Sequence, residues 1–266
     1  MGEGRPQVVA HRGASATRPE HTLGAFLAAL DEGADALECD VRLTADGHLV
    51  CVHDRNTKRT SQTRGVVSAM ELAELEQLNF AQWKDPWADL DDEAPDTDPE
   101  LGKVLTTRRL LETVADYDRP VELAIETKHP TRYAGLVERR LVDLLDHFGW
   151  AGPHSPVRVM SFSWVALRRV RKLAPDLRSV LLLDGPTQWA RAQPVSERNW
   201  IAGPGMRVVR RHPELIRRMK AAGTRVHVWT VNEPADIDLC VELGVDALIT
   251  DQPGETLGYL EKCLNS

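Results

Sequence analysis

The chain has 266 residues, of which 42% are hydrophobic and 27% are charged, and its formal net charge is −7 at pH 7. This length suits one α/β barrel or two small domains, and the composition is typical of globular proteins and excludes bulk disorder. The negative charge argues against a nucleic-acid-binding protein, because a phosphate backbone requires a dominant basic face.

The sequence contains no run that is as long and apolar as a membrane span, and the segment Val8-Val9-Ala10 is too short for the core of a signal peptide. We therefore expect a cytoplasmic protein. The four cysteines, Cys39, Cys51, Cys240 and Cys263, lack metal-type spacing and are too few for a disulfide scaffold. We expect them to be reduced and to pack in the interior.

Short β-branched runs alternate with helical patterns along the whole chain, and this alternation predicts βαβ units with a parallel sheet. We expect strands at 7–11, 36–41, 48–53, 121–126, 157–162, 178–183, 206–209 and 225–230, with Trp200-Ile201 as the alternative for the seventh. Helices are expected at 22–32, 68–78, 106–117, 131–149, 163–174, 187–193, 213–222 and 234–243, and from about 255. Ser163 and Gly223 suit caps of two of these helices. Eight strands predict an α/β fold, a TIM (β/α)8 barrel formed by residues 1–266 as a single domain.

The segment from Phe80 to Lys103 interrupts this rhythm with many acidic residues among prolines. We interpret residues 80–105 as a long acidic loop or insertion after the third strand, near the barrel mouth. An EF-hand calcium loop is disfavoured because the turn glycine and the ligand spacing are missing. A lid over the mouth is the functional alternative.

Acidic residues end two of the expected strands. Side chains alternate along a strand, so Glu38 and Asp40 point to one face, as do Glu126 and Lys128 further along the chain. A buried carboxylate requires a partner or a metal, although acids at a strand end can also simply meet solvent.

Two further strands end in histidine, at His11 and His53, and Arg12 follows the first of them. A lone histidine at a strand end is more often structural than catalytic. However, the carboxyl ends of TIM-barrel strands all meet at the active-site face, so these distant residues are expected to converge there.

The residues that converge share one chemistry. Glu38, Asp40 and Glu126, without thiolates, suit one hard divalent cation, Mg²⁺ or Ca²⁺. Two histidines can share general acid and base work, while Arg12 and Lys128 supply positive charge for a phosphate. Carboxylates alone would also suit a glycosidase. The histidines and cations favour a phosphodiester.

The resemblance to a known family lies in motifs that span nearly the whole chain. In order, these are His11-Arg12-Gly13, Pro19-Glu20-His21-Thr22, Gly33-Ala34-Asp35, Glu38-Cys39-Asp40-Val41, Thr44-Ala45-Asp46-Gly47, His53-Asp54, Glu126-Thr127-Lys128, Val228-Trp229-Thr230-Val231-Asn232 and Gly244-Val245-Asp246-Ala247-Leu248-Ile249-Thr250-Asp251. The ordered set resembles the glycerophosphodiester phosphodiesterase family, a TIM-barrel family.

The resemblance implies hydrolysis of glycerophosphodiesters to sn-glycerol 3-phosphate and an alcohol, with a divalent cation. It makes Glu38, Asp40 and Glu126 the metal ligands and His11 and His53 the acid–base pair. It also places Arg12 and Lys128 on the phosphate, Trp229 in a wall of the substrate pocket and Glu20 near the metal or phosphate. The alternatives are a barrel-core aromatic for Trp229 and an ordinary helix-start acid for Glu20.

The chain departs from the family pattern at His21, where asparagine is usual, which adds a titratable group near the metal. Two alternatives to the main function stay open. Related barrels act on lysophospholipids in a phospholipase D sense, for which Phe80, Trp83 and Trp87 could form an apolar track. A barrel that binds a phosphate ligand without turnover is the alternative from a different class. The basic run Arg168, Arg169, Arg171 and Lys172 is interpreted as a solvated helix face.

Overall fold

The structure is a computed structural model that describes residues 4–84, 99–129, 131–192 and 200–264. Its strands are β1 Gln7–His11, β2 Ala36–Leu43, β3 Leu49–Cys51, β4 Glu122–Thr127, β5 Val157–Ser161, β6 Arg178–Leu183, β7 Trp200–Pro204, β8 His227–Trp229 and β9 Ala247–Thr250. Its α-helices are α1 Leu23–Asp31, α2 Lys58–Ser61, α3 Leu72–Leu75, α4 Thr107–Ala115, α5 Leu136–His147, α6 Trp164–Leu173, α7 Pro186–Ala192, α8 Met206–Arg211, α9 Pro213–Ala221, α10 Pro234–Glu242 and α11 Pro253–Leu264. Two 3₁₀ turns are η1 Val67–Ala69 and η3 Pro99–Gly102.

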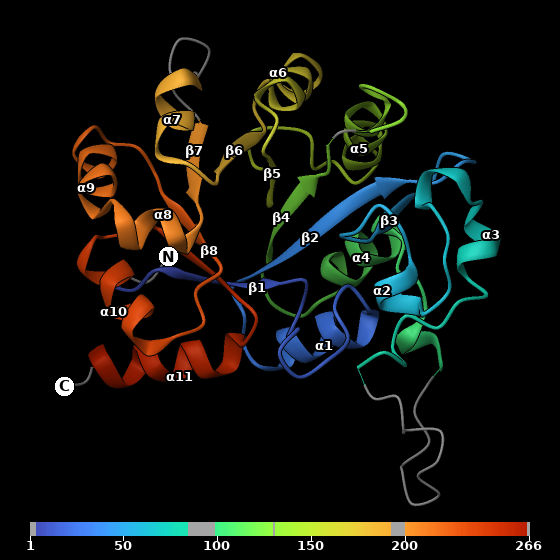
Figure 1. Cartoon of the computed structure of the whole chain (residues 1–266), viewed down its shortest axis with the longest axis horizontal. Helices are drawn as coiled ribbons and strands as arrows, with labels where there is room; N and C mark the ends of the chain where they lie inside the picture. The colour runs from blue at the N-terminus through green and yellow to red at the C-terminus, as the bar shows by residue number, and fades with distance from the viewer. Residues whose placement is uncertain (1–3, 85–98, 130, 193–199, 265–266) are drawn as a thin grey trace, which may run out of the picture.

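Eight of the strands form a parallel barrel in the order β7-β6-β5-β4-β2-β1-β9-β8. Parallel bridges between Ala202 and Val226 and between Gly205 and Trp229 join β7 to β8 and complete the ring. The helices surround the strands on the outside (Figure 1). The predicted TIM barrel is therefore confirmed.

Two of the expected barrel strands were wrong. Residues 206–209 lie in α8, and the seventh strand is β7, the alternative around Trp200. The expected strand at 48–53 is β3, which pairs antiparallel with β2 and lies off the barrel. Its short connection to β2 explains this, because a parallel return requires a crossover of a dozen or more residues. The eighth barrel strand is β9, which had been identified only as a motif.

Several helix predictions need smaller corrections. The expected helix 68–78 is divided into η1 and α3, and the one at 131–149 begins only at Leu136. The two expected caps are confirmed. Ser163 accepts a hydrogen bond from the amide of Ala166, and Gly223 follows α9 with a φ of +75°, which favours glycine.

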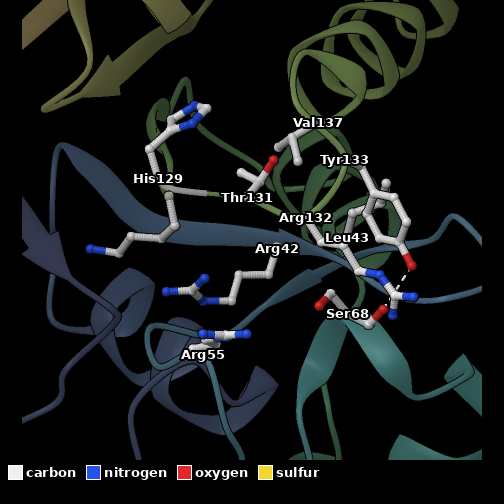
Figure 2. A pocket seen from close by; sticks show the side chains of 10 residues that line it. Arg42, Leu43, Arg55, Ser68, His129, Thr131, Arg132, Tyr133 and Val137 are labelled. Atoms are coloured by element: carbon white, nitrogen blue, oxygen red, sulfur yellow. Dashed lines mark hydrogen bonds between the residues drawn. The ribbon is translucent and has the colours of Figure 1, made fainter.

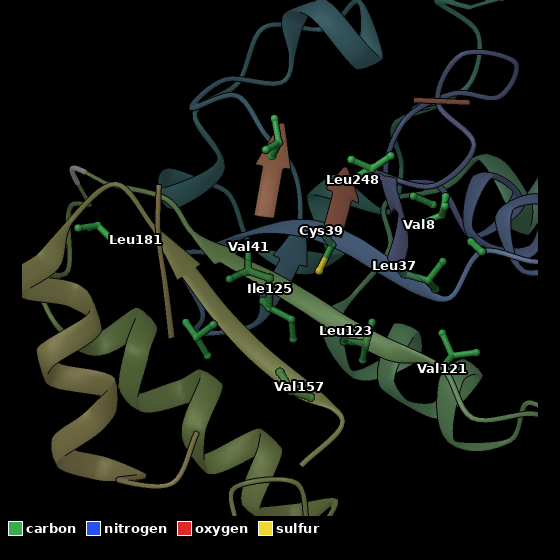
Figure 3. Packing of buried hydrophobic residues seen from close by; sticks show 14 of the residues in the cluster. Val8, Leu37, Cys39, Val41, Val121, Leu123, Ile125, Val157, Leu181 and Leu248 are labelled. Atoms are coloured by element: carbon green, nitrogen blue, oxygen red, sulfur yellow. The ribbon is translucent and has the colours of Figure 1, made fainter. Parts of the chain in front are cut away.

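Apolar side chains fill both layers of the fold. On β2 and β4, Leu37, Cys39, Leu123 and Ile125 point outward and pack with the surrounding helices (Figure 3). A second cluster lies among inward-facing positions of the barrel and includes Val9, Ala36, Ala124, Met160, Val180, Ile201 and Ile249. Alternation along each strand then directs Glu38, Asp40 and Glu126 into the barrel, above this inner apolar layer.

Polar groups lie at the amino ends of the strands. Arg158 is 1% exposed and its guanidinium lies 2.6 Å from Glu122, which also pairs with Arg178 at 2.9 Å. The nearby His227 is buried, and burial together with the charges of Arg158 and Arg225 lowers the pKa of its imidazole well below the usual value. These ion pairs lie at the face opposite the carboxyl ends of the strands, where TIM-barrel residues generally contribute to stability.

Three of the four cysteines are buried as expected, but Cys263 is exposed in the last turn of α11, where the helix faces solvent. Within the described ranges, no helix is both long and apolar enough to cross a bilayer. The ends of the acidic segment are described, but most of its acids, Asp85 and the group from Asp91 to Asp98, together with Trp87, lie outside the described residues. The placement of 80–105 over the mouth therefore stays a prediction.

Candidate active site

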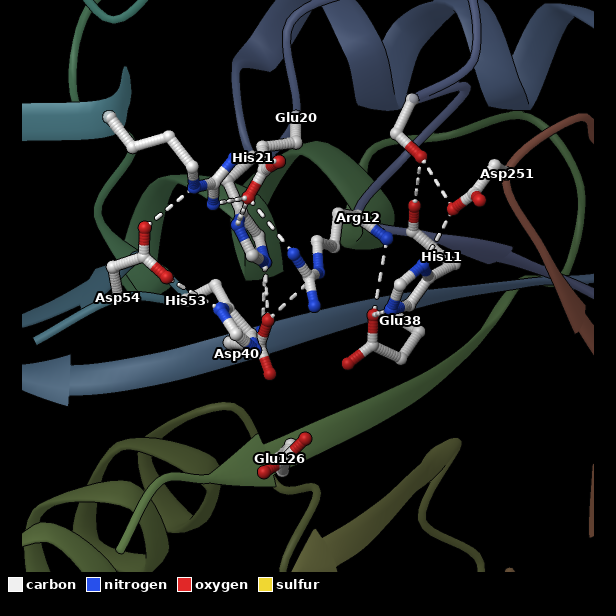
Figure 4. Close-up of polar contacts among 12 residues, drawn as sticks. His11, Arg12, Glu20, His21, Glu38, Asp40, His53, Asp54, Glu126 and Asp251 are labelled. Carbon is white, nitrogen blue, oxygen red and sulfur yellow. Dashed lines mark hydrogen bonds and ion pairs between the residues drawn. The ribbon is translucent and has the colours of Figure 1, made fainter. Parts of the chain in front are cut away.

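The carboxyl ends of β1, β2, β4 and β9 bring the predicted polar residues to one face of the barrel (Figure 4). His11 ends β1, Glu38 and Asp40 lie in β2, and Glu126 lies in β4. His53 comes from the segment that follows β3. The two acidic strands are neighbours, and Asp40 is in register with Glu126. Residues that are far apart in the sequence thus form one polar cluster.

Three carboxylates form the centre of this cluster. Glu38, Asp40 and Glu126 are each at most 6% exposed, and each offers an oxygen within 4.8 Å of the others. Burial, followed by repulsion from Asp40, raises the pKa of Glu38 well above its usual range and that of Glu126 to about 8. The raised pKa values reflect negative charge that the burial and the mutual repulsion of the carboxylates disfavour, and an all-oxygen set of this kind fits a hard divalent cation.

Two cations flank the carboxylates. Lys128 Nζ lies 2.9 Å from both Asp40 Oδ1 and Glu126 Oε2, and Arg12 Nε lies 3.1 Å from Asp40 Oδ2. Burial opposes the charged form of Asp40, but Lys128 and Arg12 hold the pKa of this carboxyl below its usual range. The buried Oδ2 of Asp40 has this ion-pair contact with Arg12 but, among the described residues, accepts no hydrogen bond of good geometry, so it retains capacity for a ligand.

The turn after β1 positions Arg12. Its backbone has a φ of +60°, and its amide donates to the carbonyl and to the side chain of Glu38 at 3.0 and 3.1 Å. Gly13 follows with a φ of +87°, and a side chain there would meet the backbone of Ala25 at 2.6 Å. The close approach of the turn to α1 therefore requires glycine at this position. This contact also fixes the backbone position of the preceding residue, Arg12.

His11 is held by an acid from the last strand of the barrel. Its Nδ1 lies 2.6 Å from Asp251 Oδ1, and Nε2 lies 4.0 Å from Glu38. Burial opposes ionisation of Asp251, but hydrogen bonds from His11, Asn232 and Ser15 lower its pKa to about 2. Since an ionised carboxylate only accepts hydrogen bonds, Nδ1 of His11 carries the proton and Nε2 faces the site.

His53 is held in a similar way. Its Nδ1 lies 2.8 Å from Asp54 Oδ1, and the other oxygen of Asp54 accepts from Arg59 Nε at 2.6 Å. Arg59 also donates twice to Glu20 at 2.7 Å, and Arg12 donates to the same carboxylate at 3.0 Å. Burial lowers the pKa of His53, and Lys128 and Arg12 add to the effect while Asp40 opposes it.

Glu20 thus bridges Arg12 and Arg59 rather than lying as a free acid at a helix start. Burial opposes its ionisation, yet the hydrogen bonds from Arg59 and the charge of Arg12 lower its pKa to about 2. Glu20 thus lies beside a predicted phosphate-binding residue, and its place near the metal or phosphate stays a prediction.

His21 contributes through an acceptor nitrogen. Its Nε2 accepts a hydrogen bond from the amide of Asp40 at 3.0 Å, and burial lowers the pKa of the ring to about 3. The imidazole is therefore neutral at pH 7, and it supports the backbone of an acidic residue without adding charge to the site.

Trp229 lies on β8, across the barrel from the acids of β4. Its Nε1 donates to the carbonyl of Gly203 at 2.7 Å, and its ring meets Phe162 edge to face at 5.4 Å. Phe162 is exposed beside it, and Trp164 and Val165, which follow Phe162 closely in the chain, are exposed as well. The ring is half-buried and belongs to the wall of the mouth as well as to the edge of the inner apolar cluster.

Sequence reasoning assigned no role to four residues that hold the histidines. Asp54, Asn232 and Asp251 all lie within the motifs given above. Their positions directly after His53 or after the last two barrel strands are the signal by which they could have been predicted. Arg59 had no such indication. Its contacts depend on how α2 returns towards the mouth, which the local pattern does not encode.

Comparison with known proteins decides the family. The model of the "Glycerophosphoryl diester phosphodiesterase family" matches residues 11–255. The chain belongs to this family. A "Probable glycerophosphodiester phosphodiesterase 1" of Mycobacterium tuberculosis is 47% identical over 262 residues, which cover 97% of this chain and 93% of the relative. A "Glycerophosphodiester phosphodiesterase" of Bacillus subtilis is 30% identical over 92% of this chain and 83% of its own length.

Solved structures agree with the glycerophosphoryl diester phosphodiesterase fold. A "Putative glycerophosphoryl diester phosphodiesterase" from Silicibacter pomeroyi has a TM-score of 0.82 and 27% identity, with 98% of this chain and 95% of that chain covered. An Oleispira antarctica phosphodiesterase, solved "in complex with the product sn-glycerol-3-phosphate", has a TM-score of 0.81 and 24% identity, with 97% of each chain covered. The predicted family membership is confirmed.

Proposed function

We propose that this chain is a metal-dependent glycerophosphodiester phosphodiesterase that releases sn-glycerol 3-phosphate and an alcohol. The observation that carries the proposal is a buried cluster of three carboxylates between two histidines, each of which is oriented by an acid. The names of the relatives and the product in the Oleispira antarctica structure support the same reaction. Water and the diester together balance to one phosphate monoester and one alcohol.

Glu38, Asp40 and Glu126 are the residues that would hold the cation. Their oxygen donors and their excess negative charge suit Mg²⁺ or Ca²⁺ rather than a metal that prefers nitrogen or sulfur. When bound, the cation would polarise the phosphate and draw charge from its oxygens.

Arg12 and Lys128 border the place that the phosphate would occupy. Each already pairs with Asp40, yet each retains further N–H donors. Burial disfavours the charge of Lys128, but Asp40 and Glu126 raise the pKa of its ammonium above the usual value, so it stays positive. These two side chains would hold the phosphate and stabilise the charge that develops on it.

The histidines would divide the proton transfers. His53 is neutral at pH 7, so its Nε2 accepts the proton of the attacking hydroxyl, either of water or of the adjacent glycerol hydroxyl. His11 donates a proton from Nε2 to the leaving alkoxide, and the Asp251 carboxylate on Nδ1 stabilises the ring while it carries that proton. A glycerol hydroxyl as nucleophile would give a cyclic phosphate, which water then opens.

Trp229 would form the wall for the glycerol part. Its hydrogen bond to Gly203 fixes the indole, and its apolar face suits the carbon chain of glycerol beside Phe162.

The test is release of sn-glycerol 3-phosphate from glycerophosphocholine by pure protein before and after EDTA, with Mg²⁺ and Ca²⁺ added back separately. His11→Ala and His53→Ala are expected to lower turnover by about 10²-fold to 10⁴-fold, and His154→Ala, an exposed histidine, serves as the matched control. Activity that EDTA does not reduce would refute the proposed metal dependence. Near-normal turnover by either histidine variant would exclude that histidine from the mechanism.

A second candidate is a lysophospholipase D-type activity on lipid diesters. The basis suggested by the sequence is weak, because Phe80 is buried with Leu75 and Trp83 contacts Arg59 and Lys84, while Trp87 is outside the described residues. The exposed Phe162, which contacts Trp229, and the exposed Trp164 and Val165 that follow it in the chain favour this candidate instead. Faster turnover of lysophosphatidylcholine than of glycerophosphocholine would support this candidate.

A further inference from the structure

Figure 2 shows a pocket lined by several basic side chains, and the pocket shares Lys128 with the catalytic cluster. It has a volume of about 350 Å³ and lies between β2, the segment after β3 and the segment between β4 and α5. Among the residues that the structure describes, its lining includes Arg42, Arg55, Lys128 and Arg132 together with one histidine, but no carboxylate. A pocket of this size is within the usual range for small ligands, but its charge is unusual for a protein of net charge −7.

The positive charge of the pocket is not neutralised from within. In the part of the chain that the structure describes, neither Arg55 nor Arg132 forms an ion pair, and the Arg132 guanidinium lies over the ring of Tyr133 at 5.6 Å. Arg42 and Lys128 are compensated by carboxylates of the catalytic cluster, whereas Arg55 adds a repulsive charge to Arg42. The guanidinium groups of Arg55 and Arg132, which are unpaired among the described residues, favour the binding of an anion.

Two residues connect the pocket to the reaction centre. Lys128 lines it and also contacts Asp40 and Glu126 at 2.9 Å. Arg42 lines it and donates through two nitrogens to the carbonyl of His53, at 2.9 and 2.7 Å. A group in the pocket is therefore next to a phosphate held at the carboxylates.

The pocket lies on the opposite wall from Trp229. Trp229 lies on β8, and β4 leads to the pocket. Three strands separate β8 from β4 in either direction around the ring: β9, β1 and β2 on one side, and β7, β6 and β5 on the other. A diester whose phosphate lies at the centre and whose glycerol lies against Trp229 must extend its alcohol towards β2 and β4.

We propose that this basic pocket binds the alcohol part of the substrate and selects glycerophosphodiesters whose alcohol carries a second anionic group, such as a phosphate monoester. The inference rests on the proposed function and specifies the substrate class of the same site. Arginines recognise phosphate through paired N–H donors, and Arg55 and Arg132 have donors to offer. A cationic alcohol such as choline meets repulsion instead.

The experiment compares two diesters that differ by one phosphate group: glycerophosphoglycerol and glycerophosphoglycerol 3-phosphate. Wild-type protein is expected to favour the phosphorylated diester in kcat/KM. Arg55→Ala and Arg132→Ala are each expected to reduce that preference about tenfold, mainly through a higher KM for the phosphorylated diester. A tenfold change corresponds to the free energy of about one charge-assisted hydrogen bond. The matched control is Arg211→Ala, which removes an exposed charge on α8 and should leave the preference unchanged.

The outcomes separate the two proposals. Turnover of both diesters without a preference, or a preference that survives both substitutions, overturns the pocket assignment and leaves the proposed function intact. If neither diester is hydrolysed, the proposed function fails, and the pocket is tested by calorimetric titration of inorganic phosphate into EDTA-treated protein. Affinity reduced at least tenfold in the double variant Arg55→Ala/Arg132→Ala supports the pocket, and unchanged affinity overturns it.

Discussion

The contact between His11 and Asp251 gives the sharpest test of the proposed division of labour. Replacing Asp251 by asparagine keeps the size of the side chain but removes its charge. Asn232 fixes how the new amide would be oriented, because its Oδ1 accepts from Thr250 Oγ1 and from the amide of residue 251, and its Nδ2 therefore faces the acid at 2.7 Å. The oxygen of the new amide is expected to face Asn232 and its NH₂ group to face His11.

This orientation moves the proton of the neutral His11 ring from Nδ1 to Nε2. A donor opposite Nδ1 forces that nitrogen to accept, so the neutral ring carries its proton on Nε2 and the charged ring loses its partner. A hydrogen bond to a charged group contributes about 2 kcal/mol, which corresponds to roughly 30-fold in rate. With the altered tautomer, we expect Asp251→Asn to lower kcat on glycerophosphocholine by about 10²-fold to 10⁴-fold, with little change in KM.

The assay compares substrates with good and poor leaving groups. A nitrophenolate leaves without protonation, so Asp251→Asn should affect bis(p-nitrophenyl) phosphate much less than glycerophosphocholine if His11 is the general acid. Asp238→Asn, an exposed acid on α10 that accepts from Tyr259, is the matched control. An equal loss on both substrates would refute the reasoning, since it would show that Asp251 does not act through protonation of the leaving group.

Three other predictions concern the metal cluster, the bridge to His53 and the amino ends of the strands. Burial raises the pKa of Glu126 to about 8, so holding this carboxyl in the metal-free site costs stability that a neutral amide avoids. Glu126→Gln should therefore raise the Tm of EDTA-treated protein by about 4 °C and weaken Mg²⁺ binding in calorimetry; a lower Tm without metal would contradict this. Arg59→Ala should reduce kcat/KM about tenfold, without rescue by Arg59→Lys, because only arginine pairs with both acids; full rescue by lysine would exclude this geometry. The imidazole of His227 has a lowered pKa in the folded state, so the unfolded chain binds more protons and stability falls as the pH drops below about 6.5, by up to about 1.4 kcal/mol per pH unit. His227→Gln should flatten this dependence in urea unfolding, whereas the exposed control His147→Gln should not, and identical slopes would disprove the assignment.

The fold could be predicted because strand and helix patterns alternate so regularly. The errors occurred where a local pattern does not determine the partner. The apolar run at Leu49 has the character of a barrel strand, and only its short connection to β2 indicates an antiparallel hairpin. The run at Met206 is β-branched but forms α8, where Val208 and Val209 are buried in the packing of the barrel. In both cases the tertiary environment outweighed local propensity.

The central residues of the site could be predicted from the chemistry of the strand ends. Alternation along β2 and β4 placed Glu38, Asp40 and Glu126 on one face, and the structure brings them within reach of one ion. The partners of the histidines were harder to predict, because Asp251 is 240 residues from His11 and because the contact of Arg59 with Glu20 spans 39 residues. The basic pocket was also missed, since Arg55 and Arg132 become neighbours only through the barrel.

The antiparallel hairpin of β2 and β3 divides the site into two parts that differ in how well they tolerate sequence changes. His11 and the three carboxylates lie on strands that close the barrel, where an altered backbone would disturb the whole ring. His53 and Arg55 follow β3, which pairs with β2 alone among the strands that the structure describes and lies outside that ring. Substitutions at Arg55 can therefore change which alcohol is accepted while His53, Asp54 and the barrel are kept, so substrate range within such barrels can diversify at low structural cost.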